Sequence, residues 1–238
     1  MIYAQILAGG VGKRMGNSDL PKQFLLLGSK PIIIHTIEQF LLVSEISEII
    51  IGCPKDWINF MNDLLKKYIN TDKKITVIEG GPTRNETIMN ACNYIEEKNG
   101  LSEKDIIITH DAVRPFVDTH VIKENIKKSK KCDAVDTIIP VSDTIVEVKN
   151  KDSITSIPIR DNLYIGQTPQ TFNIKKLIET YKMLTKEEKE ILTDACKIFV
   201  LKNKDVSYVN GSEFNIKITT MYDLKIANAI LEVGTRND

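Results

Sequence analysis

Apolar and polar residues follow one another along the chain in blocks, and the spacing inside each block predicts its secondary structure. Short apolar runs bounded by glycine, proline or polar residues are typical of buried strands. Segments with apolar residues three and four positions apart are typical of helices that bury one face. The pattern predicts strands at residues 2–8, 48–52, 75–79, 105–109, 134–141 and 206–209, and helices at 32–43, 56–68, 85–97, 119–131, 175–184, 192–199 and 220–231.

Strands and helices alternate through the first part of the chain. Such alternation predicts an α/β fold, with a Rossmann-like open, mostly parallel twisted sheet and helices on both faces. No repeat, low-complexity tract or linker divides the sequence, so we expect residues 1–238 to form a single domain. Residues 143–159 depart from the pattern, because apolar residues there alternate with period two around a polar turn at 149–152. This segment predicts a protruding β-hairpin.

Charge and cysteine content narrow the class of protein. Lys and Arg together number 32, as do Asp and Glu. The balance argues against a partner that is a nucleic acid or a membrane surface, because proteins that bind these carry a basic excess. The four cysteines lie far apart without a C-x-x-C pair, which is typical of free thiols in a reducing compartment. The first apolar run is too short for a signal peptide or membrane span, so we expect a cytoplasmic location.

The first strand opens into a glycine-rich loop, Leu7-Ala-Gly-Gly-Val-Gly-Lys-Arg-Met-Gly16, which Pro21-Lys-Gln-Phe24 follows. Glycines let backbone N–H groups turn toward an anion. Lys13, Arg14 and Lys22 add positive charge, so the loop suits a polyphosphate. A surface turn is the alternative for a glycine loop alone, and the attached cations argue against it.

Two better-known glycine loops are excluded by their own requirements. The dinucleotide fingerprint needs a third glycine where Met15 stands, and a helix directly after it. No helix is predicted before Pro31. The Walker A pattern needs a glycine where Leu7 stands.

Two more polar segments follow predicted strands, where ligands bind in open α/β sheets. Gly80-Gly-Pro-Thr-Arg-Asn-Glu-Thr87 opens a helix, and His110-Asp-Ala-Val-Arg-Pro115 follows the fourth strand. For the first, the alternative is a glycine turn with Thr83 or Asn85 as the helix N-cap. In the second, Asp111 is a candidate ligand for Mg²⁺, with phosphate and water supplying the other ligands. We expect His110 to be a core residue, and Arg114 to form an ion pair or contact phosphate.

Taken together, these motifs resemble the signature of sugar-phosphate nucleotidyltransferases. Within that group the chain is similar to the cytidylyltransferases that act on methylerythritol phosphate or ribitol 5-phosphate, over nearly its whole length and with the motifs in family order. The resemblance implies an enzyme that joins CTP to a polyol phosphate, releases pyrophosphate and uses Mg²⁺. It also implies a homodimer, in which the 143–159 hairpin is an arm that reaches the partner.

Details of sequence favour the ribitol branch. The start Met1-Ile-Tyr-Ala4, the segment Tyr164-Ile-Gly-Gln-Thr-Pro-Gln170 and the segment Leu192-Thr-Asp-Ala-Cys-Lys197 look like that branch. Ala112 departs from it, because many ribitol enzymes have serine there. The product of the ribitol branch, CDP-ribitol, implies a role in teichoic acid or similar polymer synthesis. Methylerythritol phosphate is the alternative acceptor.

Residue roles follow from the resemblance. It implies catalysis by Arg14, Lys22, Arg160 and Lys217, acceptor binding by Arg160, Thr193 and Lys217, and metal binding by Asp111. It implies nucleotide binding by Leu7, Ala8, Gly9, Gly10, Gly12, Gly80, Gly81, Pro82, Arg84, Asn85, Thr87, Ala112, Arg114 and Thr168. A nucleotide-binding regulator without turnover is the competing hypothesis, and the acceptor cations Arg160 and Lys217 argue against it.

Overall fold

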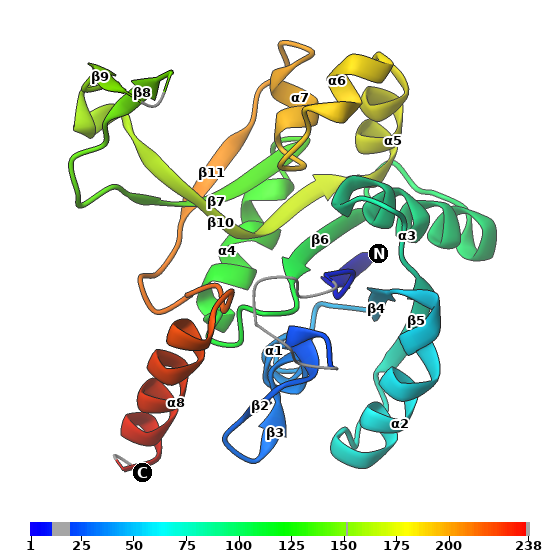
Figure 1. Ribbon diagram of the computed structural model, residues 1–238. Coiled ribbons are helices and arrows are strands. Elements are labelled where there is room, and N and C mark those ends of the chain that lie inside the picture. The colour runs from blue at the N-terminus through cyan, green and yellow to red at the C-terminus, as the bar shows by residue number, and fades with distance from the viewer. Residues whose placement is uncertain (11–19, 151, 237–238) are drawn as a thin grey trace.

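A seven-stranded sheet in the order β11-β7-β10-β6-β1-β4-β5 forms the centre of the molecule (Figure 1). The computed structural model describes residues 1–10, 20–150 and 152–236. The strands are β1 (Ile2–Leu7), β4 (Glu48–Cys53), β5 (Lys74–Glu79), β6 (Ile106–Asp111), β7 (Ala134–Pro140), β10 (Tyr164–Asn173) and β11 (Ser207–Asn210). Neighbours pair in parallel except where β10 pairs with β6 and β7. The predicted mostly parallel α/β fold is confirmed.

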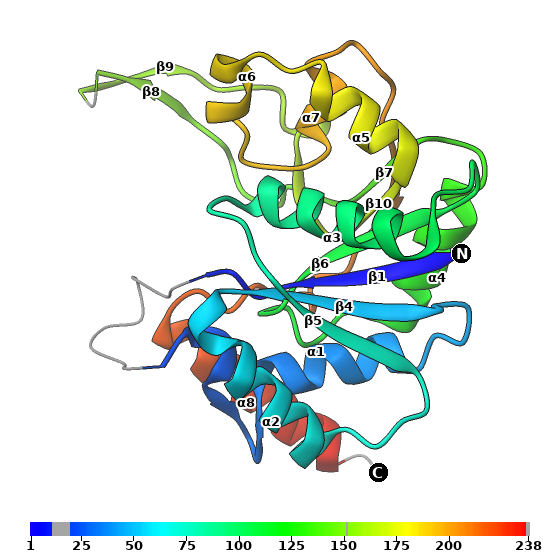
Figure 2. The ribbon, with the colours of Figure 1, turned by 90° about the vertical axis from the view of Figure 1, so that its right-hand side faces the viewer.

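Helices cover both faces of this sheet (Figure 2). The apolar core on one face joins α1 (Ile32–Leu41), α2 (Ile58–Tyr68) and α4 (Thr119–Ser129) to the strands. The core on the other face joins α3 (Arg84–Asn99), α5 (Ile174–Lys182) and α7 (Lys197–Val200). The final helix, α8 (Met221–Arg236), packs beside the short strand β2 (Leu26–Leu27), which pairs with β3 (Lys30–Pro31). Short 3₁₀ turns form at η1 (Lys22–Phe24), η2 (Lys55–Trp57) and η3 (Arg160–Asn162).

Alternate side chains of the strands explain the two cores, because successive residues of a strand point to opposite faces. In β1, Ala4 and Ile6 belong to the first core and Tyr3 to the second. In β4, Ile49 belongs to the first core and Ile50 to the second. Both faces of these strands are therefore buried, which is why their sequences are continuous apolar runs.

Strand β10 is the main element that the hydrophobic pattern does not predict. Its segment contains Pro169, which lacks a backbone donor and argues against a central strand. The ladder with β7 accommodates the proline through a register shift between Gln167 and Thr171. There the Thr137 hydroxyl donates to the Pro169 carbonyl at 2.6 Å. A local irregularity therefore allows this segment to lie between β6 and β7.

The helix predicted at residues 192–199 is wrong over its first half. Residues 192–196 form turns, and α7 begins only at Lys197. Asp194 Oδ1 accepts the N–H of Cys196 at 2.7 Å, so its side chain binds the backbone in place of a helical bond. The short, charged helix α6 (Lys186–Glu190) precedes these turns and was not predicted.

The predicted hairpin is confirmed. Strands β8 (Glu147–Lys149) and β9 (Ser153–Ser156) pair in a small sheet of their own, which stands away from the body in both ribbon views (Figures 1 and 2). Its apolar side chains Val148 and Ile154 are about half exposed, at 49% and 58%.

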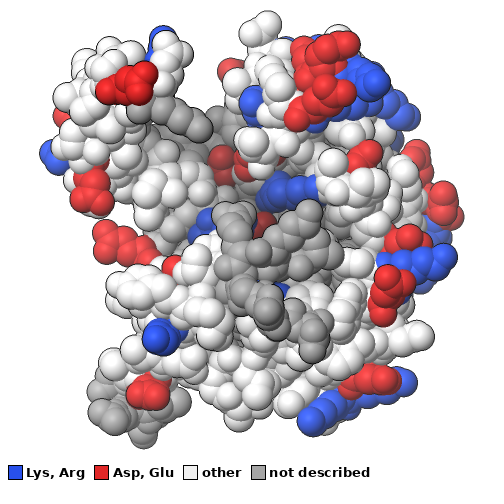
Figure 3. All heavy atoms as spheres, in the orientation of Figure 1, with Lys and Arg blue, Asp and Glu red and all other residues white. Residues whose placement is uncertain are grey.

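Surface and thiol chemistry agree with the composition. On the face that Figure 3 shows, acidic and basic side chains are interspersed over the surface. All four cysteines are free, and Cys132 is the one that is not fully buried. Within the part of the chain that the structure describes, no helix combines the length and the apolar character needed to cross a membrane.

Candidate active site

Side chains from several strand ends meet around one cavity of about 240 Å³. Because β1, β4, β5 and β6 run in parallel, their carboxyl ends share one edge of the sheet, and the segments that follow them converge there. Of the predicted site residues, this cavity is lined by Leu7, Gly9, Gly10, Lys22, Gly81, Pro82, Arg84, Thr87, Asp111, Ala112 and Lys217. Residues separated by up to 210 positions are thus brought to one place.

The start of the glycine loop is tied to its surroundings by backbone and amide contacts. Gln23 Nε2 donates to the Ala8 carbonyl at 2.7 Å, and the Ala112 N–H donates to the Leu7 carbonyl at 3.1 Å. A Cβ added at Gly10 would lie 3.7 Å from Lys22 Cε, so this lysine runs beside the loop. Gly12 and Arg14, which the sequence assigns to this site, lie outside the described residues.

The second glycine segment is held by a capping box at the start of α3. Thr83 accepts the N–H of Glu86, and the Glu86 carboxylate accepts the N–H of Thr83 at 3.0 Å, so Thr83 is the N-cap. A Cβ on Gly81 would lie 2.5 Å from Glu86 Cβ, so the close packing requires glycine there. Thr87 Oγ1 accepts the N–H of Gly81 at 3.0 Å. Several N–H groups of this segment are therefore already bonded, and Gly81, Pro82, Arg84 and Thr87 of the segment line the cavity.

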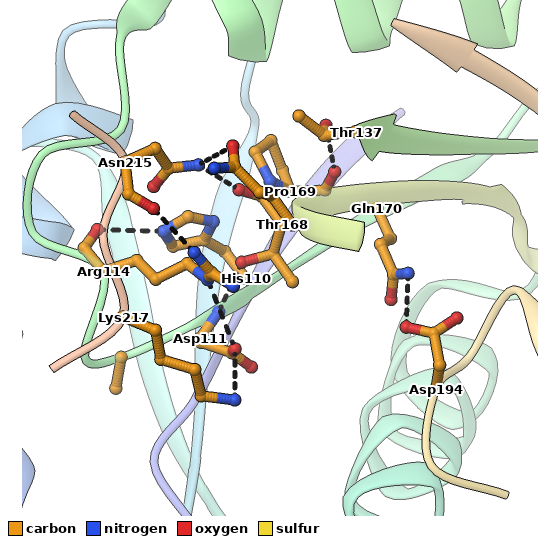
Figure 4. Close-up of polar contacts among 12 residues, drawn as sticks. His110, Asp111, Arg114, Thr137, Thr168, Pro169, Gln170, Asp194, Asn215 and Lys217 are labelled. Atoms are coloured by element: carbon orange, nitrogen blue, oxygen red, sulfur yellow. Dashed lines mark hydrogen bonds and ion pairs between the residues drawn. The ribbon is translucent and has the colours of Figure 1, made fainter. Parts of the chain in front are cut away.

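Asp111, at the carboxyl end of β6, is surrounded by cations (Figure 4). Lys217 Nζ lies 2.9 Å from its Oδ2, and the Nε atoms of Arg84 and Arg114 lie 3.6 Å from Oδ1 and Oδ2. Burial of Asp111 acts against its charge, but the Arg84 and Lys217 charges outweigh burial and hold the pKa of this carboxyl well below its usual range. Asp111 is therefore ionised at neutral pH.

Asn215 forms hydrogen bonds with Arg114 and Thr168, which both contact Asp111. Its carbonyl accepts Arg114 Nη1 at 2.6 Å, and its side-chain amide donates to the Thr168 carbonyl at 2.7 Å (Figure 4). Thr168 Oγ1 in turn accepts the N–H of Asp111 at 3.2 Å. Arg114 and Thr168 thus orient Asp111 and its neighbours from the protein side of the cavity wall. Asn85 and His110 are likewise buried, and His110 is a core residue as expected.

One of the two candidate metal sites suits Mg²⁺. Asp111 lines the cavity and offers carboxylate oxygens, which fits an ion held by one or two carboxylates and substrate phosphates. The second cluster, Asp136, Asp194 and Cys196, brings three potential ligand atoms within 4.8 Å of one another. Its thiol suits softer metals. Moreover, Gln170 Nε2 already donates to both carboxylates, at 2.9 Å and 2.6 Å. Asp111 is therefore the better candidate for Mg²⁺, through Oδ1, because Lys217 Nζ already lies 2.9 Å from Oδ2.

Two residues that the sequence assigns to the acceptor do not line this cavity. Arg160 is exposed, and its Nη1 donates to the Ser142 carbonyl at 3.3 Å, at the base of the hairpin. Thr193 is exposed in the turns before α7. Among the described residues, Lys217 alone of the three predicted acceptor-binding residues contributes to the cavity wall.

Sequence reasoning missed the polar side chains buried in the strands. Gln170 is fully buried in β10, and Asp136 lies inside the apolar strand β7. A carboxylate within an apolar run is itself a signal, because burying an unpaired charge is costly. Asn215, two residues before the predicted acceptor residue Lys217, is also buried, but a neutral amide is a weaker sign of function in a sequence.

Comparisons with known proteins agree on one family. The model of the family described as IspD, 2-C-methyl-D-erythritol 4-phosphate cytidylyltransferase, matches residues 2–233. A solved 4-diphosphocytidyl-2C-methyl-D-erythritol synthase from Anaerococcus prevotii is 30% identical with a TM-score of 0.80, covering 97% of this chain and 96% of that one. A 2-C-methyl-D-erythritol 4-phosphate cytidylyltransferase from Francisella tularensis is 28% identical with a TM-score of 0.79, covering 95% and 98%. The enzyme of that name from Thermus thermophilus, at 20% identity and a TM-score of 0.72, covers 97% and 98% and supports the fold alone.

Proposed function

The chain belongs to the IspD family of cytidylyltransferases, and we propose that it transfers the cytidylyl group of CTP to the phosphate of a short polyol phosphate, with release of pyrophosphate. One observation carries this proposal. A single cavity joins Gly9 and Gly10 of the first loop, Gly81 of the second, and the Asp111–Lys217 pair. The loops suit a nucleotide, and the cation cluster suits the phosphate that attacks it.

The chemistry requires positioning more than proton transfer. An acceptor phosphate is already anionic near neutral pH, so the attacking oxygen needs no general base. The main difficulty is the approach of two anions, which cations around the reacting phosphates reduce. In this proposal Lys22 and Arg14 stabilise charge on the triphosphate, while Lys217 orients the acceptor. Arg160, which does not line this cavity, would have to reach the acceptor from outside the cavity wall. Asp111 would help to hold Mg²⁺, which when bound neutralises part of the triphosphate charge.

Two acceptors are candidates, and each has its own support. The family description and the solved relatives name 2-C-methyl-D-erythritol 4-phosphate, so the comparisons favour that acceptor. The segments 164–170 and 192–197 favour ribitol 5-phosphate, which the sequence led us to expect. The second segment includes Thr193, one of the residues that the resemblance assigns to acceptor binding. Identities of about 30% leave room for a different acceptor on the same framework.

A direct assay tests both levels of the proposal. Pyrophosphate release would be measured with CTP and each acceptor in parallel, with ATP and UTP as nucleotide controls. We expect turnover with CTP and with one acceptor preferred over the other by at least about tenfold, because a misplaced phosphate loses its in-line approach. Preference for either acceptor assigns it. No pyrophosphate release with either acceptor would overturn the proposed function.

The hairpin supports a second proposal, a homodimer in which it covers the partner. Val148, Ile154, Ile157 and Ile159 are exposed along or beside the hairpin, and such apolar side chains are stabilised by a covering surface. We expect deletion of residues 144–156 to yield monomers with weakened acceptor use, since Arg160 follows this arm. Analytical ultracentrifugation measures the outcome, and a deletion variant that remains dimeric contradicts the assignment.

A further inference from the structure

The guanidinium of Arg84 has few partners for a charged group at the wall of the cavity. Its Nη2 donates to Gln170 Oε1 at 3.1 Å, which is its one hydrogen bond within the described part of the chain. Its Nη1 is buried without a hydrogen-bond partner among those residues. Its ion pair with Asp111 is long, at 3.6 Å. The orientation of Arg84 therefore depends on Gln170.

Gln170 is itself oriented by two carboxylates. Its Nε2 donates to Asp136 Oδ1 at 2.9 Å and to Asp194 Oδ2 at 2.6 Å (Figure 4 shows the second contact). Ionised carboxylates only accept hydrogen bonds, so the NH₂ end of the amide must face them. The oxygen end is then left to face Arg84. Because Gln170 is fully buried, no water competes for either end.

The two carboxylates differ in how they bind the amide. Asp136 uses the same oxygen, Oδ1, to accept from Gln170 and from the N–H of Thr137. Asp194 uses both oxygens, because its Oδ1 accepts the N–H of Cys196 and its Oδ2 accepts from Gln170. An asparagine at 136 can keep both bonds through its one oxygen. An asparagine at 194 has only one oxygen and must lose one of the two bonds that Asp194 accepts. Substitutions at 136 and 194 can therefore be compared directly.

We propose that Gln170 is a positioning residue for the reaction, which Asp136 and Asp194 lock so that its carbonyl holds the Arg84 guanidinium against the nucleotide side of the cavity. The inference rests on the proposed function for its kinetic consequence. Its structural content, that Gln170 sets the place of Arg84, does not depend on turnover.

A double-mutant cycle tests the proposal. Gln170→Met keeps the length of the side chain and removes both polar ends, and Arg84→Ala removes the group that Gln170 positions. We expect Gln170→Met to lower kcat/KM for CTP by about tenfold, because a loosely held arginine loses alignment. In the Arg84→Ala background the same substitution should have almost no further effect, since its target is gone. Effects that multiply in the double variant would overturn the proposal.

Asparagine variants provide a second, gentler test that does not depend on how well Gln170→Met folds. Asp194→Asn should lower kcat/KM for CTP severalfold, and Asp136→Asn should lower it less. Equal losses, or the reverse order, would contradict the locking arrangement. Thr171→Val is the control on the same strand, because the Thr171 hydroxyl bonds Asn125 of α4 on the opposite face. This control should leave kcat/KM for CTP unchanged.

Crystal structures separate this inference from the proposed function. In Gln170→Met, or in Asp194→Asn where the first variant does not fold, the Arg84 guanidinium should leave its place beside Asp111. An unchanged Arg84 overturns the inference even in an active enzyme. If the wild type releases no pyrophosphate with either acceptor, the proposed function fails, and a displaced Arg84 still supports the positioning role.

Discussion

Asp111 is buried and Asp136 is partly buried in the same sheet, and their pKa values shift in opposite directions. Asp111 lies between Lys217, Arg84 and Arg114, and these charges hold its pKa well below the usual range. Asp136 lies beside a neutral amide and near the Asp194 carboxylate. Burial, reinforced by that charge, raises the pKa of Asp136 to about 6. Burial by itself acts to raise the pKa of both carboxyl groups. The direction of the net shift is therefore set by the charges that the fold brings near each group.

The uneven distribution of charge around these two carboxylates lets a chain without net charge attract anions. Three cations around one carboxylate leave a net charge of +2 (3 − 1) in the Asp111 cluster. This local excess lies at the cavity and suits phosphate groups. The Asp136 and Asp194 carboxylates form a negatively charged pair, and both accept hydrogen bonds from Gln170. Arg84 joins the two regions, because it reaches Asp111 with Nε and Gln170 with Nη2.

Removing the Asp111 charge should have the largest effect on stability. Asp111→Asn leaves three cations close together without a counter-charge, and we expect the free energy of unfolding to fall by about 3 kcal/mol at pH 7. Because the pKa of Asp111 is lowered in the folded state, its stabilisation exists above about pH 4 and is lost as the pH falls further. Urea denaturation measures both effects.

The control for this variant is Asp63→Asn. Asp63 pairs with Lys66 on the surface of α2 with its side chain 75% exposed, so its loss should cost less than about 0.5 kcal/mol. Equal effects of the two substitutions would show that the Asp111 cluster adds nothing beyond a surface ion pair.

Removing the nearest cation should act on turnover more than on folding. Lys217→Gln removes the ammonium 2.9 Å from Asp111 Oδ2. We expect kcat/KM for the acceptor to fall by about 100-fold, because a cation aimed at reacting phosphates contributes several kcal/mol. Pyrophosphate release at varied acceptor concentration measures this. The exposed Lys225 of α8 supplies the control, and a Lys225→Gln variant that loses as much activity would contradict a specific role for Lys217.

Removing the Asp136 charge should have the smallest effect, with the opposite sign. Because its pKa is raised to about 6, the folded state binds more protons than the unfolded state between about pH 4 and 6. The contribution of Asp136 to stability therefore falls as the pH rises through this window. We expect Asp136→Asn to raise the free energy of unfolding at pH 8 by on the order of 1 kcal/mol, and to flatten this part of the profile.

Urea denaturation from pH 4 to pH 8 distinguishes this effect from a general change in charge. The exposed Asp133, just before β7, supplies the control through Asp133→Asn. A profile for Asp136→Asn that runs parallel to wild type would show that Asp136 does not titrate in this window.

The sequence by itself determined the alternating strands and helices, the hairpin, and the segments that supply most of the cavity wall. These are local properties, because apolar spacing, glycines and caps act over a few residues. Gly81 and Thr83 could be placed at a helix start without knowing what lies opposite. Only the tertiary structure decided that β10 is a central strand despite Pro169, since the register shift against β7 accommodates it. Likewise, the ionisation of Asp111 and Asp136 depends on charges far away in the chain. Arg84 and Gln170 are 86 positions apart, so no local pattern predicts their hydrogen bond.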